Sequence, residues 1–407
     1  MLIGPFTQLL TMEGLPSGGR ILDEALTIVS NGGIRIREGL ITEIGDFDEL
    51  RGSSDEEVLE TPTPSVALPG LIDAYTMICF AGARTHEYVL RLGGCTYEEL
   101  AEQGGGILDT VRKTRAASPE ELMSSLIGRA HLLLSSGVTT CEVKSGYGLT
   151  IEDEVKLLRV IGEADAHQPV TLLPSCLAAH VKPWEFSTNQ EYLSFLIEEL
   201  FPVLKKEKLT QRIDILVEDI AFSVEEARNY LQAAKDAGFS ITVGGNMFSE
   251  GGARLGAEVG ALSVSHLDNA TVDEAAAMQQ AHVAGIVLTN ASLGLGRPYA
   301  PARMLLDSGI TLAIASGWNP GTAPLGDLLI GAAVMGCAEK LTMAETLAGI
   351  TSRAALALGM KDRGVLAPGM RADVTAFSCE EYQEILYHQG ALKPSAVFIQ
   401  GQCVLSR

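Results

Sequence analysis

Eight short apolar segments, separated by stretches of helical length, dominate the middle of the chain. They lie near residues 67–72, 138–143, 169–175, 213–218, 239–243, 261–265, 284–289 and 310–315. Segments between them, such as 119–135 and 224–237, carry apolar residues at helical spacing. Strands that alternate with helices form parallel sheets, and eight such units in a chain of this length are typical of a closed (β/α)8 TIM barrel. We therefore predict an α/β fold with a barrel over 67–363, and functional residues in the loops that follow its strands.

The two ends of the chain have a different pattern. Residues 26–47 consist of short alternating apolar stretches broken by Asn-Gly-Gly and Glu-Gly, which indicates strands linked by hairpins. Residues 364–379 and 396–405 have the same character, with Gly and Pro between apolar runs. We predict that 1–66 and 364–407 together form one small β-sandwich domain beside the barrel.

The charge of the chain argues against two classes of partner. With 51 acidic and 30 basic residues its net charge is −21, and such a surface repels nucleic-acid phosphates and anionic lipids. The seven cysteines are scattered and never form a Cys-x-x-Cys pair, which favours reduced thiols in the cytoplasm over a disulfide framework. The first residues show no basic segment followed by an apolar core, so we expect no signal peptide, and no apolar run is long enough to span a bilayer.

Motifs placed after the predicted strands resemble those of imidazolonepropionases in the amidohydrolase superfamily. In chain order they are PGLID (69–73), GARTHEY (82–88), RLGGCTYEEL (91–100), GGGILDTVRKTRAAS (104–118), EVKSGYGL (142–149), LAAHVKP (177–183), GGARLGAEVGALSVSHLDN (251–269), YAPAR (299–303), NPG (319–321) and GVLAPGMRADV (364–374). Each motif alone is a weak signal, but their order and spacing identify the chain as a divergent member of this family. The resemblance implies a hydrolase of small carboxylates and a homodimer.

The positions that bind the catalytic metal in the family hold other residues here. The resemblance places the family's His-x-His pair on Tyr75 and Met77. It places the metal-binding histidine of the fifth strand on Val243, and the metal-binding aspartate after the eighth strand on Gly317. A zinc or iron site needs several imidazole, carboxylate or thiolate donors. We therefore expect neither a metal nor another cofactor.

The substrate side of the family's site is largely retained. The resemblance implies that an imidazolone ring bearing a propionate is held by Arg84, Tyr97, Tyr147, His180, Asn319 and Gly321. A guanidinium offers a planar fork to a carboxylate, and tyrosine hydroxyls and the backbone N–H groups of a Gly-containing loop add donors.

The catalytic groups are expected among the residues at the strand ends. His180 and His266 match family positions there, and histidine exchanges a proton near neutral pH, so one of the two is expected to act as general base. Tyr75 and Asn246, which replaces the family's catalytic glutamate, are expected to be neutral donors in the space that the metal would fill.

Three functions fit this combination. We favour a metal-independent hydrolase of thiohydantoin (2-thioxo-imidazolone) propionate, the compound expected when a thiolated histidine such as ergothioneine is degraded, with hydantoin propionate and hydrogen sulfide as products. Hydrosulfide is a good leaving group, and soft sulfur would capture a zinc ion. The first alternative is a ring-opening enzyme that acts on imidazolone propionate or an N-substituted analogue. The second is a catalytically inactive homologue that binds such a metabolite.

Overall fold

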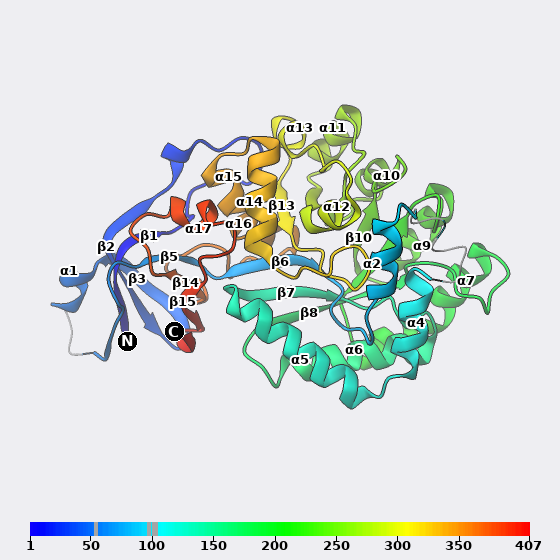
Figure 1. Cartoon of the computed structure of the whole chain (residues 1–407), viewed down its shortest axis with the longest axis horizontal. Helices are drawn as coiled ribbons and strands as arrows, with labels where there is room; N and C mark the ends of the chain where they lie inside the picture. Colours follow the sequence, from blue (N-terminus) through cyan, green and yellow to red (C-terminus); the bar gives the residue numbers. More distant parts are fainter. Residues whose placement is uncertain (53–55, 96–98, 100–104) are drawn as a thin grey trace.

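The central segments of the chain form one parallel sheet in which every strand pairs with the next one in sequence. Its strands are β6 (Leu71–Thr76), β7 (Val138–Lys144), β8 (Thr171–Ala179), β9 (Arg212–Val217), β10 (Ser240–Gly245), β11 (Ser263–His266), β12 (Ala284–Leu288) and β13 (Leu312–Ala315). A parallel bridge between Thr76 and Trp318 brings the first strand to the loop after the last, so the sheet nearly closes. In this computed structural model, which describes residues 1–52, 56–95, 99 and 105–407, the predicted (β/α)8 barrel is confirmed (Figure 1).

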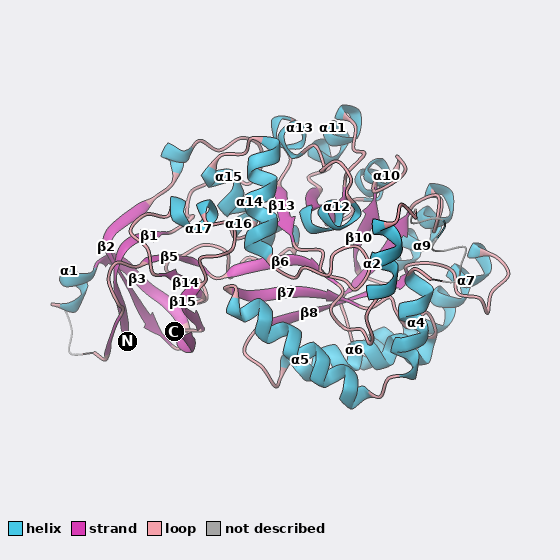
Figure 2. Ribbon diagram, viewed as in Figure 1, coloured by secondary structure: helices cyan, strands magenta, loops and turns pink. Residues whose placement is uncertain are grey.

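Helices surround the barrel sheet (Figure 2). They are α2 (Thr85–Leu92), α4 (Ile107–Ala116), α5 (Pro119–Ser135), α6 (Ile151–Asp165), α7 (Asn189–Phe195), α8 (Phe201–Glu207), α9 (Val224–Asp236), α10 (Gly252–Val259), α11 (Val272–Gln280), α12 (Thr289–Leu295), α13 (Ala302–Asp307), α14 (Leu328–Glu339), α15 (Met343–Gly349) and α16 (Ser352–Ala357). Four of them, α5, α9, α11 and α15, begin with a Ser or Thr and a Glu three residues later, a reciprocal cap that fixes where each helix starts. No helix in the described part of the chain has the length and apolarity needed to cross a membrane.

Both ends of the chain contribute to a second sheet, at the left of Figure 1. Its strands are β1 (Leu2–Leu10), β2 (Ile28–Arg37), β3 (Leu40–Asp46), β4 (Val58–Glu60), β5 (Val66–Pro69), β14 (Val374–Phe377), β15 (Pro394–Ile399) and β16 (Gln402–Ser406). Two short helices, α1 (Phe47–Arg51) and α17 (Gln383–Tyr387), belong to the same terminal segments. The strand order β16-β15-β14-β5-β1-β2-β3 places β14 from the C-terminal segment directly beside β5. The prediction that the two termini build one small β-domain is therefore confirmed.

The predicted bounds of the first barrel strand, 67–72, differ from those in the structure. The segment is divided between β5 of the β-domain and β6 of the barrel, with Gly70 between them. A Cβ atom at Gly70 would lie 2.3 Å from Thr139 Oγ1, so the chain passes against β7 at this point. Residues on both sides of the break, such as Leu68 and Leu71, are fully buried, and the apolar pattern therefore does not reveal it.

Candidate active site

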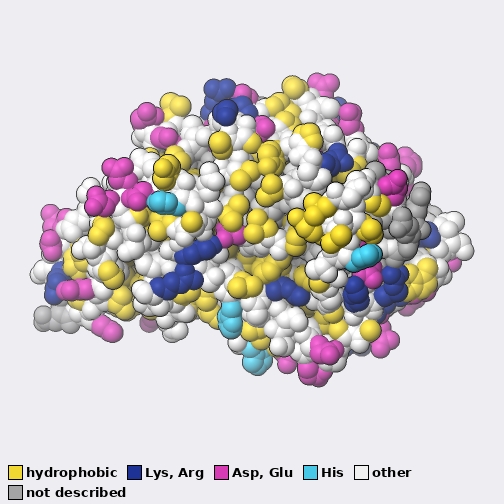
Figure 3. Space-filling model, in the orientation of Figure 1, with side chains coloured by type: hydrophobic (Ala, Val, Ile, Leu, Met, Phe, Trp, Pro, Cys, Tyr) yellow, Lys and Arg dark blue, Asp and Glu magenta, His cyan; other side chains and the backbone are white. Residues whose placement is uncertain are grey.

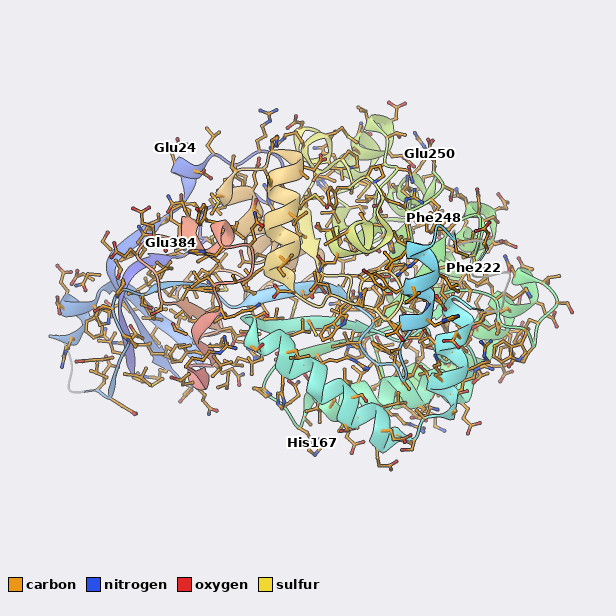
Figure 4. The ribbon with its side chains drawn as sticks, viewed as in Figure 1. Glu24, His167, Phe222, Phe248, Glu250 and Glu384 are labelled. Carbon is orange, nitrogen blue, oxygen red and sulfur yellow. The ribbon has the colours of Figure 1, made fainter. Side chains whose placement is uncertain are left out.

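A cavity of about 50 Å³ lies at the carboxyl ends of the barrel strands, where a TIM barrel carries its active site. Six of the residues predicted from the sequence line it: Tyr75, Arg84, Tyr147, His180, His266 and Asn319. Most of the remaining wall is apolar, from Met77, Ile107, Leu216, Ile220, Met247 and Phe248. Figure 4 labels Phe248, which follows β10 and appears beside α2 in this view. The cavity thus combines two imidazoles and one guanidinium with a largely apolar surface.

His180 follows β8 and is oriented by the backbone. Its Nδ1 lies 2.9 Å from the carbonyl oxygen of Gly146. Because a carbonyl oxygen only accepts, Nδ1 carries the proton and Nε2 keeps its lone pair. Burial, followed by the nearby charge of Arg84, lowers the pKa of His180 to about 4. His180 is therefore neutral at pH 7 and has one nitrogen that can accept a proton.

His266 ends β11 in a strained conformation. Its φ of 77° lies in the left-handed region, which non-glycine residues seldom adopt and which is enriched at functional sites. Burial lowers its pKa to about 3. Its Nδ1 is buried and has no hydrogen-bond partner among the described residues. A buried polar atom without a partner is uncommon, and together with the strained backbone it marks His266 as a candidate functional residue.

Arg84 precedes α2 and is held by an acidic neighbour. Its Nε and Nη2 donate to Glu87 Oε2 at 2.8 and 2.6 Å. The other carboxylate oxygen of Glu87 accepts from the Gly106 N–H at 2.9 Å. Gly321 lies so close that a Cβ atom there would be 2.1 Å from Arg84 Nη1. The guanidinium is thus fixed between the Glu87 carboxylate and the Asn-Pro-Gly loop.

The Asn319 side chain organises that loop. Its Oδ1 accepts from the N–H groups of Gly321 and Thr322, both at 2.8 Å. Its Nδ2 donates to Gly317 O and to Thr322 Oγ1, again at 2.8 Å. The Gly321 N–H was expected to bind the substrate anion, but here it is engaged within the loop. Gly321 contributes space for Arg84 instead.

Asn246 does not line the cavity, in contrast to the prediction. Its side chain is fully buried; Nδ2 donates to both oxygens of Glu274 at 3.1 and 3.0 Å, and Oδ1 accepts from the Ala253 N–H at 2.7 Å. Glu274 also forms the N-terminal cap of α11 with Thr271, so its carboxylate is held at the start of that helix, where it accepts from Asn246. Asn246 therefore connects the end of β10 to α10 and α11. Tyr97, the remaining predicted residue, lies outside the described residues.

A buried ion cluster beneath the cavity was not predicted. Lys144 Nζ, at the end of β7, lies 2.8 Å from Glu142 Oε2 and 2.7 Å from Asp214 Oδ2, and all three side chains are almost completely buried. Burial lowers the pKa of Lys144, but the two carboxylates outweigh this and the net pKa is raised. The ammonium also lies 4.7 Å from the ring centroid of Tyr75, whose edge meets His266. A Glu-x-Lys pair puts both side chains on one face of a strand, and this signal points to Glu142 and Lys144 but not to Asp214.

The positions of the family's metal ligands do not form a metal site. Val243 and Gly317 offer no donor side chain, Met77 offers a weak thioether, and burial raises the pKa of Tyr75 so that its hydroxyl stays protonated. In the described part of the chain, no group of three or more His, Cys, Asp or Glu side chains is arranged to hold an ion. The donor set therefore does not fit a zinc or iron ion at this place.

The chain is similar to known imidazolonepropionases over nearly its whole length. The chain is 38% identical to the imidazolonepropionase of Symbiobacterium thermophilum, over 98% of this chain and 95% of that enzyme. It is 37% identical to the imidazolonepropionase of Myxococcus xanthus, over 99% of this chain and 96% of that enzyme. No protein-family model matches it.

Solved structures resemble it in fold. The atrazine chlorohydrolase of Arthrobacter aurescens TC1, complexed with zinc, has a TM-score of 0.71 at 16% identity and covers 100% of this chain and 95% of its own. The Helicobacter pylori aminofutalosine deaminase has a TM-score of 0.71 at 17% identity, over 99% of this chain and 100% of its own.

Proposed function

Because the chain belongs to the imidazolonepropionase family of amidohydrolases, we propose that it hydrolyses a five-membered imidazolone-type ring bearing a propionate without a bound metal. The favoured substrate is thiohydantoin propionate, which yields hydantoin propionate and hydrogen sulfide.

The observation that carries this proposal is that the substrate-binding residues of the family are retained whereas its metal ligands are replaced. Arg84, Tyr147 and His180, which correspond to the family's substrate-binding side, line one cavity. The metal positions hold side chains that cannot replace the metal. Without a metal to generate hydroxide near neutral pH, an amide bond is a poor target. A ring carbon that carries sulfur is an easier one, because hydrosulfide leaves readily.

The lining of the cavity also suits sulfur. Met77 and Met247 contribute polarizable thioethers, and Leu216 and Phe248 contribute apolar surface. A thione sulfur is larger than a carbonyl oxygen and is a weaker hydrogen-bond acceptor, so an apolar surface costs it less than it would cost an oxygen. This environment favours a thioxo ring over its oxo analogue.

The proposed reaction uses the chain's own side chains. Nε2 of His180 takes a proton from water as the water oxygen attacks the ring carbon between the two nitrogens, and negative charge develops on sulfur. The Tyr75 hydroxyl, which stays protonated, donates a hydrogen bond toward that charge. His180 then returns the proton to sulfur. The carbon–sulfur bond then breaks, and the hydroxyl proton of the intermediate passes through Nε2 of His180 to the departing hydrosulfide, giving the ring carbonyl and hydrogen sulfide.

A direct assay tests the substrate. The purified protein is incubated with thiohydantoin propionate and, separately, with imidazolone propionate, and sulfide release and ring opening are followed independently. We expect sulfide release from the first compound with its ring left closed. Ring opening of the second compound alone would establish the oxo substrate instead, and consumption of neither would indicate an inactive homologue that binds such a compound.

Metal content is a separate prediction. We expect the purified protein to contain far less than one zinc or iron ion per chain by mass spectrometry, because the donor set at the barrel mouth does not fit them. Incubation with dipicolinate followed by gel filtration is expected to leave the rate of sulfide release unchanged. One ion per chain, together with loss of activity on chelation and its return with zinc, would contradict metal independence.

Substitution of Gly321 by alanine is expected to weaken substrate binding. The new Cβ atom would lie 2.1 Å from Arg84 Nη1, so the guanidinium must move away from its present place. A hydrogen bond to a charged group contributes about 1.5–3 kcal/mol, and we expect KM for thiohydantoin propionate to rise about 10- to 100-fold with a smaller change in kcat. The same substitution at the exposed Gly162 of α6, where a Cβ atom meets nothing within 4 Å, is the control. Equal KM values for the two variants would show that Arg84 does not hold the carboxylate.

A further inference from the structure

A second and larger cavity adjoins the first. It has a volume of about 440 Å³ and lies between the segment around α2 and the loop after β13. Among the described residues, the two cavities share one lining residue, Arg84. Phe80 of the outer cavity contacts Tyr147 of the inner one edge-on, with the ring centroids 6.4 Å apart. We call the larger space the outer chamber.

The size of the outer chamber exceeds what a propionate arm requires. The inner cavity of about 50 Å³ holds only about three to five water-sized groups, which is close to the size of a five-membered ring. The outer chamber falls in the range of about 300–1,000 Å³ that accommodates whole small-molecule ligands. A ring in the inner cavity would direct its acidic arm past Arg84 into a space with room for a longer arm.

The lining of the outer chamber is cationic and aromatic. Three arginines, Arg84, Arg91 and Arg129, line it together with rings that include Tyr88 and Trp318, and none of its lining residues in the described chain is acidic. The whole chain has 51 acidic residues against 30 basic ones, so a lining with three arginines runs against its composition, even though Glu87 pairs with one of them, Arg84. On the face shown in Figure 3, Lys and Arg side chains also gather near α2 and α4.

Arg129, on α5, has no carboxylate within ion-pair distance among the described residues. Its Nη1 donates to the carbonyl oxygens of Ile78 and Phe80 at 2.7 and 2.9 Å, and its guanidinium lies 3.6 Å from the ring centroid of Phe80. Within the described residues, only Nη1 of Arg129 has a hydrogen-bond partner, which leaves Nε and Nη2 without one. A half-buried guanidinium with two available nitrogens is a site for an anion.

We propose that the outer chamber binds a second anionic group, so that a diacid derivative of thiohydantoin propionate is preferred over thiohydantoin propionate itself. Its ring occupies the inner cavity, its first carboxylate binds Arg84, and a second carboxylate, on an extended or branched arm, binds Arg129. The ring assignment rests on the proposed function, whereas the pairing of two carboxylates with two arginines rests on the chamber alone.

Ligands without a ring test the chamber independently of catalysis. Calorimetric titration with linear diacids from succinate to pimelate, each compared with its monomethyl ester, measures what the second carboxylate contributes. We expect one chain length to bind at least about tenfold more tightly than its monoester, the lower end of what a hydrogen bond to a charged group supplies. Arg129→Gln should abolish this difference, and Arg129→Lys should restore part of it. Arg228→Gln, which removes an equal charge on α9, should leave it unchanged.

Several results would overturn the proposal. They are absence of diacid binding at tens of millimolar, equal affinity for diacid and monoester, or a difference that survives in a folded Arg129→Gln protein. Failure of the proposed function is distinguishable from these. If thiohydantoin propionate is not hydrolysed while the diacid preference depends on Arg129, the chamber assignment stands and the reaction assignment fails.

Discussion

Replacement of His180 by glutamine is expected to lower kcat/KM for sulfide release by about 10²–10⁴-fold, which is what general base catalysis supplies. The glutamine amide can still donate to the Gly146 carbonyl oxygen, as Nδ1 does now, but it cannot take a proton from water. The comparison is made by steady-state kinetics at pH 7. His131→Gln, at an exposed position on α5, is the matched control and should retain full activity.

The pH profile of the unaltered protein separates catalysis from packing. With a pKa of about 4, His180 is neutral and competent well below pH 6.5, so kcat/KM should stay level from about pH 7 down to pH 5 and fall only near pH 4. Stability changes over the same range. Histidines of the unfolded chain take up protons below about pH 6.5, whereas buried His180 and His266 do so only near pH 4 and 3. The unfolded state then binds more protons, and the free energy of unfolding falls as pH falls through this window.

Unfolding must therefore be measured at each pH beside the rate. If kcat/KM falls near pH 6.5 while the protein stays folded, His180 does not act as the base with the lowered pKa. A fully active His180→Gln protein would likewise contradict the mechanism, and the strained His266 would then be the next residue to replace.

The barrel was predictable because its strands are physically distinctive. A strand buried on both faces appears as a short run of apolar residues, and helices between such runs force a parallel arrangement. The rule that barrel chemistry lies at strand ends, together with the family resemblance, predicted His180, His266 and Tyr147 as site residues, and the structure brings all three to one cavity. The division of residues 67–72 between two sheets was not predictable, since both halves are equally buried and apolar.

The orientation of individual side chains was harder to predict. Asn246 stands in the position of the family's catalytic glutamate, yet the Glu274 carboxylate attracts its amide away from the cavity. That contact joins residues 28 apart in sequence, and only the fold brings them together. Gly321 was predicted as a donor, but its N–H lies within reach of the neighbouring Asn319 side chain. In both cases a hydrogen-bond partner that is close in the folded structure decides the role of the residue.

Replacement of Lys144 by methionine is expected to reduce the free energy of unfolding by about 3–5 kcal/mol, since it leaves Glu142 and Asp214 buried without a counter-charge. Urea denaturation at pH 7 measures the change. Lys113→Met is the control: Lys113 Nζ lies 2.6 Å from Asp109 on an exposed helix surface, and such pairs contribute at most about 1 kcal/mol.

The loss of stability in the Lys144→Met protein should depend on pH, and further substitutions should reverse it. Burial already raises the pKa of Asp214 in the folded state, and without Lys144 the positive charge that opposes this rise is lost. Folding then binds protons, so the deficit should be smaller at pH 5 than at pH 8. Adding Glu142→Gln and Asp214→Asn removes both buried charges and should recover most of the lost stability. A Lys144→Met protein as stable as its parent at pH 8 would show that the cluster is not charged. If stability is recovered in the triple variant but activity is not, the charged cluster contributes to the site beyond stability, and the Tyr75 ring, 4.7 Å from Lys144 Nζ, is its point of contact.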